Sequence, residues 1–63
     1  MKMAEKDRVI YRLAVVYRAY DDANPDVGMG WDDDHFIDMA LADMKWQRSD
    51  VNYNFIMKWM KNK

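Results

Sequence analysis

The sequence predicts an all-α protein, a compact three-helix bundle with helices at about residues 3–20, 33–47 and 50–62. Each of these segments lacks glycine and proline and repeats its apolar residues at a helical spacing. Both glycines and the only proline lie between the first two segments. A chain of 63 residues can build one hydrophobic core at most, so we expect residues 1–63 to form a single three-helix domain.

The first predicted helix carries one apolar stripe. Its members fall on one face at roughly 100° per residue, and they are Val9, Ile10, Leu13, Val16, Tyr17 and Tyr20. Valine and tyrosine also suit a strand. A helix is favoured because strict alternation is missing and because arginines recur at positions 8, 12 and 18.

An acidic turn, residues 21–34, follows with the sequence DDANPDVGMGWDDD and carries six of the eleven carboxylates. Asn24, Pro25 and Asp26 are typical of a turn, and the glycines permit a positive φ. We expect Asp32 or Asp33 to cap the next helix, because a carboxylate accepts hydrogen bonds from its free N–H groups. Turn formation and helix capping alone could therefore account for many of these aspartates.

The second predicted helix has two apolar faces, which indicates that it contacts two neighbours. One face holds Phe36, Ile37, Ala40, Leu41 and Met44, and the other holds His35, Met39, Ala42 and Trp46. Ser49 is the expected N-cap of the third helix. The inward side chains expected there are Tyr53, Ile56, Met57, Trp59 and Met60.

Charge is unevenly distributed, although the net charge is only -1. No lysine or arginine occurs between Ala19 and Met44, a window with eight aspartates. This balance argues against nucleic acid as a partner, including a helix-turn-helix mode through the third helix. The charged start and the absence of a long apolar run predict a cytoplasmic protein with no membrane partner.

The residue types point to binding more than to catalysis. We expect a small non-catalytic interaction protein that binds another protein and modulates it, most simply as an inhibitor, or that forms a homodimer. Small chains of this kind are often encoded by phages, which is a general expectation about such chains. The expected contact residues are Asp26, Asp32, Asp33, Asp34, Tyr11, Arg12, Arg18 and Trp46, because aromatic and arginine side chains are enriched at interfaces. The alternative is that these side chains only pack within the bundle.

The acidic turn also resembles the calcium loop of EF-hand proteins, in which oxygen ligands at alternate positions surround the cation. The resemblance implies calcium ligands at Asp22, Asn24, Asp26 and Asp33, and it covers only this loop. Val27 stands where the family has glycine, and Asp33 is shorter than the usual glutamate. A cation-binding helix-loop-helix is therefore the second hypothesis.

Enzyme activity is not expected, and neither is a cofactor. The chain has no cysteine, one histidine (His35) and one serine (Ser49), which the prediction assigns to different elements. A nucleophile therefore lacks an adjacent base.

Overall fold

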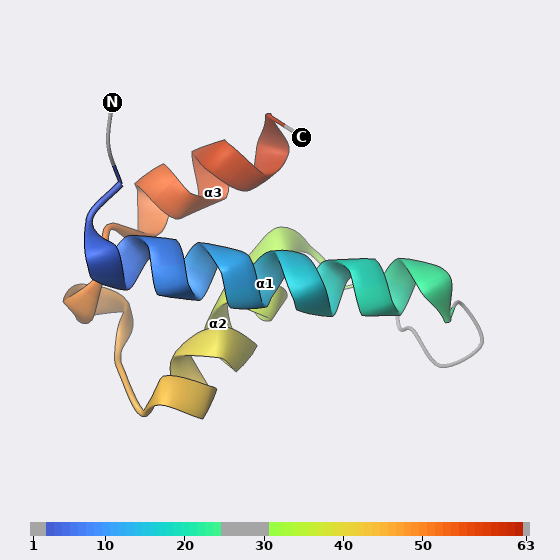
Figure 1. The fold of residues 1–63 in the computed structure, drawn as a ribbon, viewed down its shortest axis with the longest axis horizontal. Coiled ribbons are helices and arrows are strands. Elements are labelled where there is room, and N and C mark those ends of the chain that lie inside the picture. Colours follow the sequence, from blue (N-terminus) through green and yellow to red (C-terminus); the bar gives the residue numbers. More distant parts are fainter. Residues whose placement is uncertain (1–2, 25–30, 63) are drawn as a thin grey trace.

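A computed structural model describes residues 3–24 and 31–62. Three α-helices follow one another, α1 (Glu5–Ala23), α2 (Asp33–Met44) and α3 (Tyr53–Lys61), with a short 3₁₀ helix, η1 (Arg48–Asp50), before α3 (Figure 1). The described part of the chain contains no strand. The predicted all-α, three-helix architecture is confirmed.

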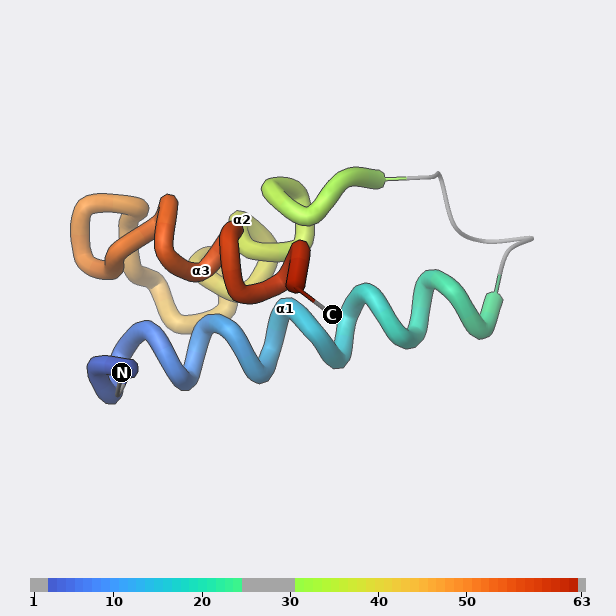
Figure 2. Tube along the Cα trace, turned by 90° about the horizontal axis from the view of Figure 1, so that it is seen from above, coloured from blue at the N-terminus to red at the C-terminus, as the bar shows by residue number. Residues whose placement is uncertain are grey.

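The helices form two layers. All three helices contact one another, and α2 and α3 lie on the same side of α1 (Figure 2). Helix α1 is the longest, and its C-terminal turns extend beyond the other two helices (Figures 1 and 2). This end of α1 therefore has fewer neighbours to cover its side chains.

One hydrophobic core lies between the layers. Each α-helix supplies one isoleucine with 0% exposure, Ile10, Ile37 and Ile56. The full core consists of Ile10, Ala14, Phe36, Ile37, Ala40, Leu41, Ile56 and Met60. Burial of this apolar surface is the main force that holds the three helices together, because most helical stability in proteins comes from packing of an apolar face.

The predicted buried face of α1 is wrong in part. Val16 and Tyr20 are 60% and 65% exposed, whereas Ala14 and the carboxylate-bearing Asp7 are buried with Ile10. The buried face is thus turned toward Asp7 and Ala14. The apolar residues of α1 surround much of the helix, so their pattern does not define which side meets α2 and α3.

Helix α2 ends earlier than the predicted residue 47. Lys45 adopts the left-handed conformation with φ 59°, and its N–H donates to the Ala42 carbonyl at 3.1 Å. The next N–H, of Trp46, donates to the Leu41 carbonyl at 2.9 Å. This pair of bonds is a Schellman motif, which usually has glycine at the left-handed position. The sequence carries lysine there, so the end of the helix was not predicted.

Lys45→Gly is expected to stabilise the protein by about 0.5 to 1 kcal/mol, because glycine adopts the left-handed conformation without the steric cost that lysine meets. Chemical denaturation followed by circular dichroism would measure it. Lys58→Gly is the matched control, since Lys58 is exposed inside α3, and we expect it to cost about 1 kcal/mol. Equal destabilisation by both substitutions would contradict the prediction.

Helix α3 begins later than predicted, and its cap is Asn52. The Asn52 side-chain oxygen accepts from the N–H of Phe55 at 3.1 Å, while Ser49, the predicted cap, lies in η1. The backbone N–H of Asn52 donates to the buried carboxylate of Asp7 at 2.9 Å. Asp7 thereby fastens the start of α3 to the first turn of α1, a contact between residues that are distant in the sequence.

The inward face of α3 agrees with the prediction except at Trp59. Ile56 and Met60 are buried, and Tyr53 and Met57 pack against the core. Trp59 is 37% exposed, with its ring edge-on to Tyr11 and Phe55. Trp59 lies at the border of the core because these two rings cover only part of it.

Candidate functional site

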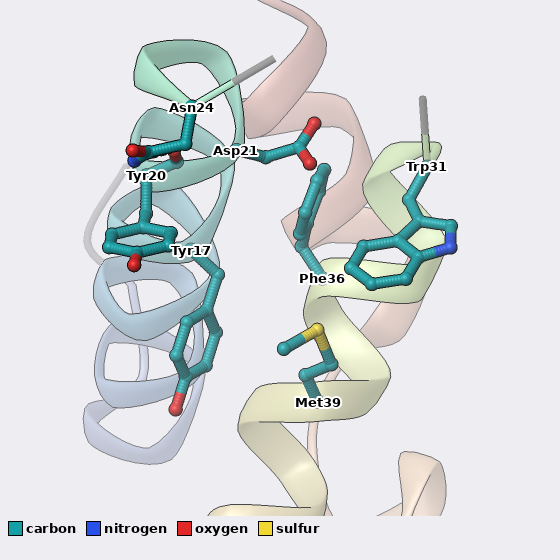
Figure 3. A pocket seen from close by; sticks show the side chains of 7 residues that line it. All are labelled: Tyr17, Tyr20, Asp21, Asn24, Trp31, Phe36 and Met39. Carbon is teal, nitrogen blue, oxygen red and sulfur yellow. Dashed lines mark hydrogen bonds between the residues drawn. The ribbon is translucent and has the colours of Figure 1, made fainter. Parts of the chain in front are cut away.

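A pocket of about 160 Å³ opens where the end of α1 faces the start of α2. Its walls come from both helices and the residues beside them (Figure 3). The lining residues are Tyr17, Tyr20, Asp21, Asn24, Trp31, Phe36 and Met39, which we call the aromatic pocket. Six of these seven lie in the window that lacks lysine and arginine.

The aromatic pocket combines a buried wall with exposed edges. Phe36 is only 2% exposed and belongs to the core, whereas Trp31 is 42% exposed. The Trp31 ring lies 4.2 Å from the His35 ring, centre to centre, and meets Phe36 edge-on at 6.3 Å. These contacts hold the indole at the mouth of the pocket, while the more exposed Tyr20 stands on the opposite wall (Figure 3).

Among the described residues that line the pocket, Asp21 supplies the only carboxylate. Its side chain points from α1 toward Phe36 across the gap (Figure 3). Among residues 3–24 and 31–62, no basic side chain forms an ion pair with it, since the ion pairs found there are Arg18–Asp33 and Arg48–Asp38. The other polar lining group, the Asn24 amide, donates to the Tyr20 carbonyl at 2.9 Å. The pocket therefore offers apolar walls and one carboxylate that those residues leave unpaired.

The predicted acidic turn lies partly in the described residues. Asp26 lies outside them. Asp32 occupies the N-cap position of α2, but its carboxylate forms no capping hydrogen bond among the described residues, and its backbone carbonyl accepts from the N–H of His35 at 3.0 Å. Asp33 and Asp34 lie in the first turn of α2, where the positive end of the helix dipole stabilises their negative charge.

These three aspartates line a second hollow, between the start of α2 and the face of α3. Its lining is Asp32, Asp33, Asp34, Tyr53, Met57 and Lys61, which we call the acidic cleft. The cleft has a volume of about 530 Å³ and is more open than the aromatic pocket. At its Tyr53 wall, burial raises the pKa of the phenol above its ordinary value.

Arg18 is held by contacts within the chain. Its guanidinium donates to the Asp33 carboxylate at 3.1 Å and to the Met60 carbonyl at 3.0 Å. It therefore links α1 to both other helices. The fold brings the predicted contact residues Arg18 and Asp33 together, and they form an ion pair with each other.

The other predicted anchors have separate surroundings. Tyr11 is half-buried, with its ring centre 5.8 Å from that of Trp59, and Arg12 is exposed. Trp46 is half-buried under the ammonium group of Lys6, 5.0 Å from the ring centre. Whether any of these residues contacts a partner stays a prediction.

The calcium hypothesis rests partly on residues outside the described ranges, Asp26 and Val27 among them. Asp22 is exposed, the Asn24 amide bonds to the backbone, and Asp33 pairs with Arg18. Within residues 3–24 and 31–62, no group of three or more acidic or histidine side chains is placed to hold a metal ion. The hypothesis stays a prediction, with no described cluster in its favour.

The aromatic pocket was not predicted as a unit. Tyr17 and Tyr20 were assigned to the core stripe of the first helix and Phe36 to that of the second. A signal was present, since aromatic residues stand on both sides of the proline and the two glycines, Tyr17 and Tyr20 before them and Trp31 and Phe36 after them. A connection that returns one helix onto the preceding helix brings the residues that flank it close together.

Comparison of the chain with protein-family models, with characterised proteins and with solved structures gave no match. Of the helices in residues 3–24 and 31–62, none has the length and apolar character needed to cross a membrane. The physical features of the two hollows are therefore the basis for any functional inference.

Proposed function

We propose that this protein is a non-catalytic binding module that modulates another protein by docking it on the aromatic pocket. One observation carries the proposal: Tyr20, 65% exposed, and Trp31, 42% exposed, flank an apolar pocket instead of completing the core. Tyrosine and tryptophan beside a desolvated pocket are the usual anchors of protein interfaces. Side chains with so much exposed surface contribute little to the stability of the fold.

The exposed apolar surface continues along α1. Val16, 60% exposed, lies one turn before Tyr20, so the two side chains stand on the same face of the helix. Exposed apolar patches of this kind on small proteins often mark interaction sites. The acidic cleft begins at Asp32, directly after Trp31 in the sequence, so its carboxylates can serve as the polar border of the same contact surface. Asp32 and Asp34 of the predicted contact set are thus kept in the proposal, while Tyr20 and Trp31 replace Tyr11 and Trp46 as the proposed anchors.

The test is capture of a partner from an extract of the organism that encodes the chain, followed by measurement of its affinity for the purified protein. Tyr20→Ala should lower this affinity by about 30-fold, since a hot-spot residue contributes about 2 kcal/mol or more. The stability of the free protein should change by less than about 0.5 kcal/mol, because Tyr20 is largely exposed.

Met44→Ala is the matched control, since Met44 is an exposed apolar residue at the other end of α2, and it should leave the affinity unchanged. Sedimentation velocity on the wild type and Tyr20→Ala distinguishes a second copy of this chain from a different partner. A partner bound equally well by the wild type and Tyr20→Ala would overturn the proposal.

A further inference from the structure

We infer that the aromatic pocket takes a cationic side chain, a lysine from a basic segment of the partner. The inference rests on the proposed docking function and adds the chemistry of the occupant. Three features of the pocket carry it: the aromatic walls, the Asp21 carboxylate and the charge of the surrounding chain.

The aromatic walls attract positive charge. Rings of Tyr17 and Tyr20 on α1 and of Trp31 and Phe36 beside or within α2 stand on opposite sides of the gap (Figure 3). The face of an aromatic ring carries partial negative charge and binds ammonium and guanidinium groups, with tryptophan the strongest. Rings grouped in this way also bury the methylene stem of a long cationic side chain.

Asp21 distinguishes a cationic occupant from a neutral one. Its carboxylate is half-buried among these rings, and no lysine or arginine of residues 3–24 and 31–62 pairs with it. A neutral anchor would remove water from this carboxylate without replacing it, which is unfavourable. An ammonium group would remove the same water and supply a counter-charge.

The wider charge pattern favours the same occupant. No lysine or arginine occurs between Ala19 and Met44, and the nearest arginine, Arg18, is already paired with Asp33. Asp32 and Asp34 extend the negative region into the acidic cleft. Complementary charge speeds the encounter with a basic segment and fixes its register.

The volume suits lysine. A protein cavity of about 150 Å³ accepts benzene, which has six heavy atoms. The aromatic pocket has about 160 Å³, and a lysine side chain has five heavy atoms. The pocket therefore has room for a whole lysine side chain beside the Asp21 carboxylate and the rings that line it.

The experiment is an NMR titration of the full chain with blocked pentapeptides Gly-Gly-X-Gly-Gly, in which X is lysine or norleucine. The two side chains differ at their ends, where lysine carries the ammonium group. The lysine peptide should shift the Trp31 indole N–H and the Tyr20 amide, and it should bind about tenfold more tightly than the norleucine peptide. Asp21→Asn should weaken this preference markedly, leaving only the part that the rings contribute. Asp22→Asn should retain it, because Asp22 is exposed and does not line the pocket.

Equal binding of the two peptides to the wild type would overturn the cationic inference and leave the docking function standing, since the pocket would then take any long side chain. Binding of neither peptide, or lysine-induced shifts at Met57 instead of Tyr20, would also overturn it. The docking function is judged separately, by the effect of Tyr20→Ala on partner affinity.

Discussion

Ile37→Ala is expected to remove a large share of the free energy of unfolding of the protein. The side chain has 0% exposure and belongs to the single core cluster of the described residues. Removal of three buried carbon atoms costs about 2 to 5 kcal/mol, because transfer energy is lost and a cavity is left. A domain of this length has a total stability of about 3 to 9 kcal/mol. The midpoint of thermal unfolding should fall by about 10 °C or more.

Two variants serve as controls for this prediction. Ile37→Val removes one carbon atom and should cost only about 0.5 to 1.5 kcal/mol. Val16→Ala should change stability by less than about 0.5 kcal/mol, because Val16 is exposed although its place in the apolar pattern suggests burial. Thermal unfolding followed by circular dichroism measures all three. A loss on Val16→Ala as large as that on Ile37→Ala would show that α1 is rotated from the orientation described above.

Asp7→Ala is expected to destabilise the protein by about 1 to 3 kcal/mol, because the N–H of Asn52 then loses the acceptor that the buried Asp7 carboxylate supplies. The effect should be local as well as global. Hydrogen exchange at the Asn52 amide should become faster relative to the amides of α1, since the start of α3 is no longer held to the first turn of α1.

Two further variants separate the hydrogen bond from other roles of Asp7. Asp7→Asn retains an oxygen acceptor and should lose less stability than Asp7→Ala. Glu5→Ala removes an exposed carboxylate from the same turn, so it tests the interaction with the helix dipole alone, which contributes about 0.3 to 1 kcal/mol. Equal losses for Asp7→Ala and Glu5→Ala, with Asn52 exchange unchanged, would mean that the hydrogen bond contributes little.

The carboxylates of the acidic turn were expected to cap a helix or to contact a partner. Those in the described residues have different roles. Asp33 forms an ion pair with Arg18, while Asp32 is exposed and forms no capping bond. Asp21, which had no special role in the prediction, lies among the aromatic rings. The position of a carboxylate in three dimensions, more than its membership of an acidic run, decides what it can bind.

The number of helices followed from the sequence because helix formation is local. The helical spacing of apolar residues over 12 to 19 residues, interrupted by the acidic turn, was enough to predict α1 and α2. Four of the five residues predicted for one apolar face of α2, Phe36, Ile37, Ala40 and Leu41, are buried together, whereas the fifth, Met44, is exposed at the end of the helix. Three helical segments with one shared interior could therefore be inferred without coordinates.

Helix ends were harder to predict. The end of α2 depends on a lysine in a left-handed conformation, and the start of α3 is held by a carboxylate 45 residues earlier in the chain. Neither feature belongs to the local pattern of apolar residues. The first is an unusual conformation for lysine, and the second forms only when α1 and α3 have already packed.

The helices, their apolar character and the uneven distribution of charge follow from local sequence, since they depend on neighbouring residues along the chain. Long-range packing sets which side of α1 is buried. It also brings Arg18 into contact with both other helices and places Tyr20, Asp21 and Trp31 around one pocket. The reason is that burial and pairing depend on how whole helices rotate and dock. Several rotations satisfy the same apolar pattern, and the contacts among all three helices select one of them.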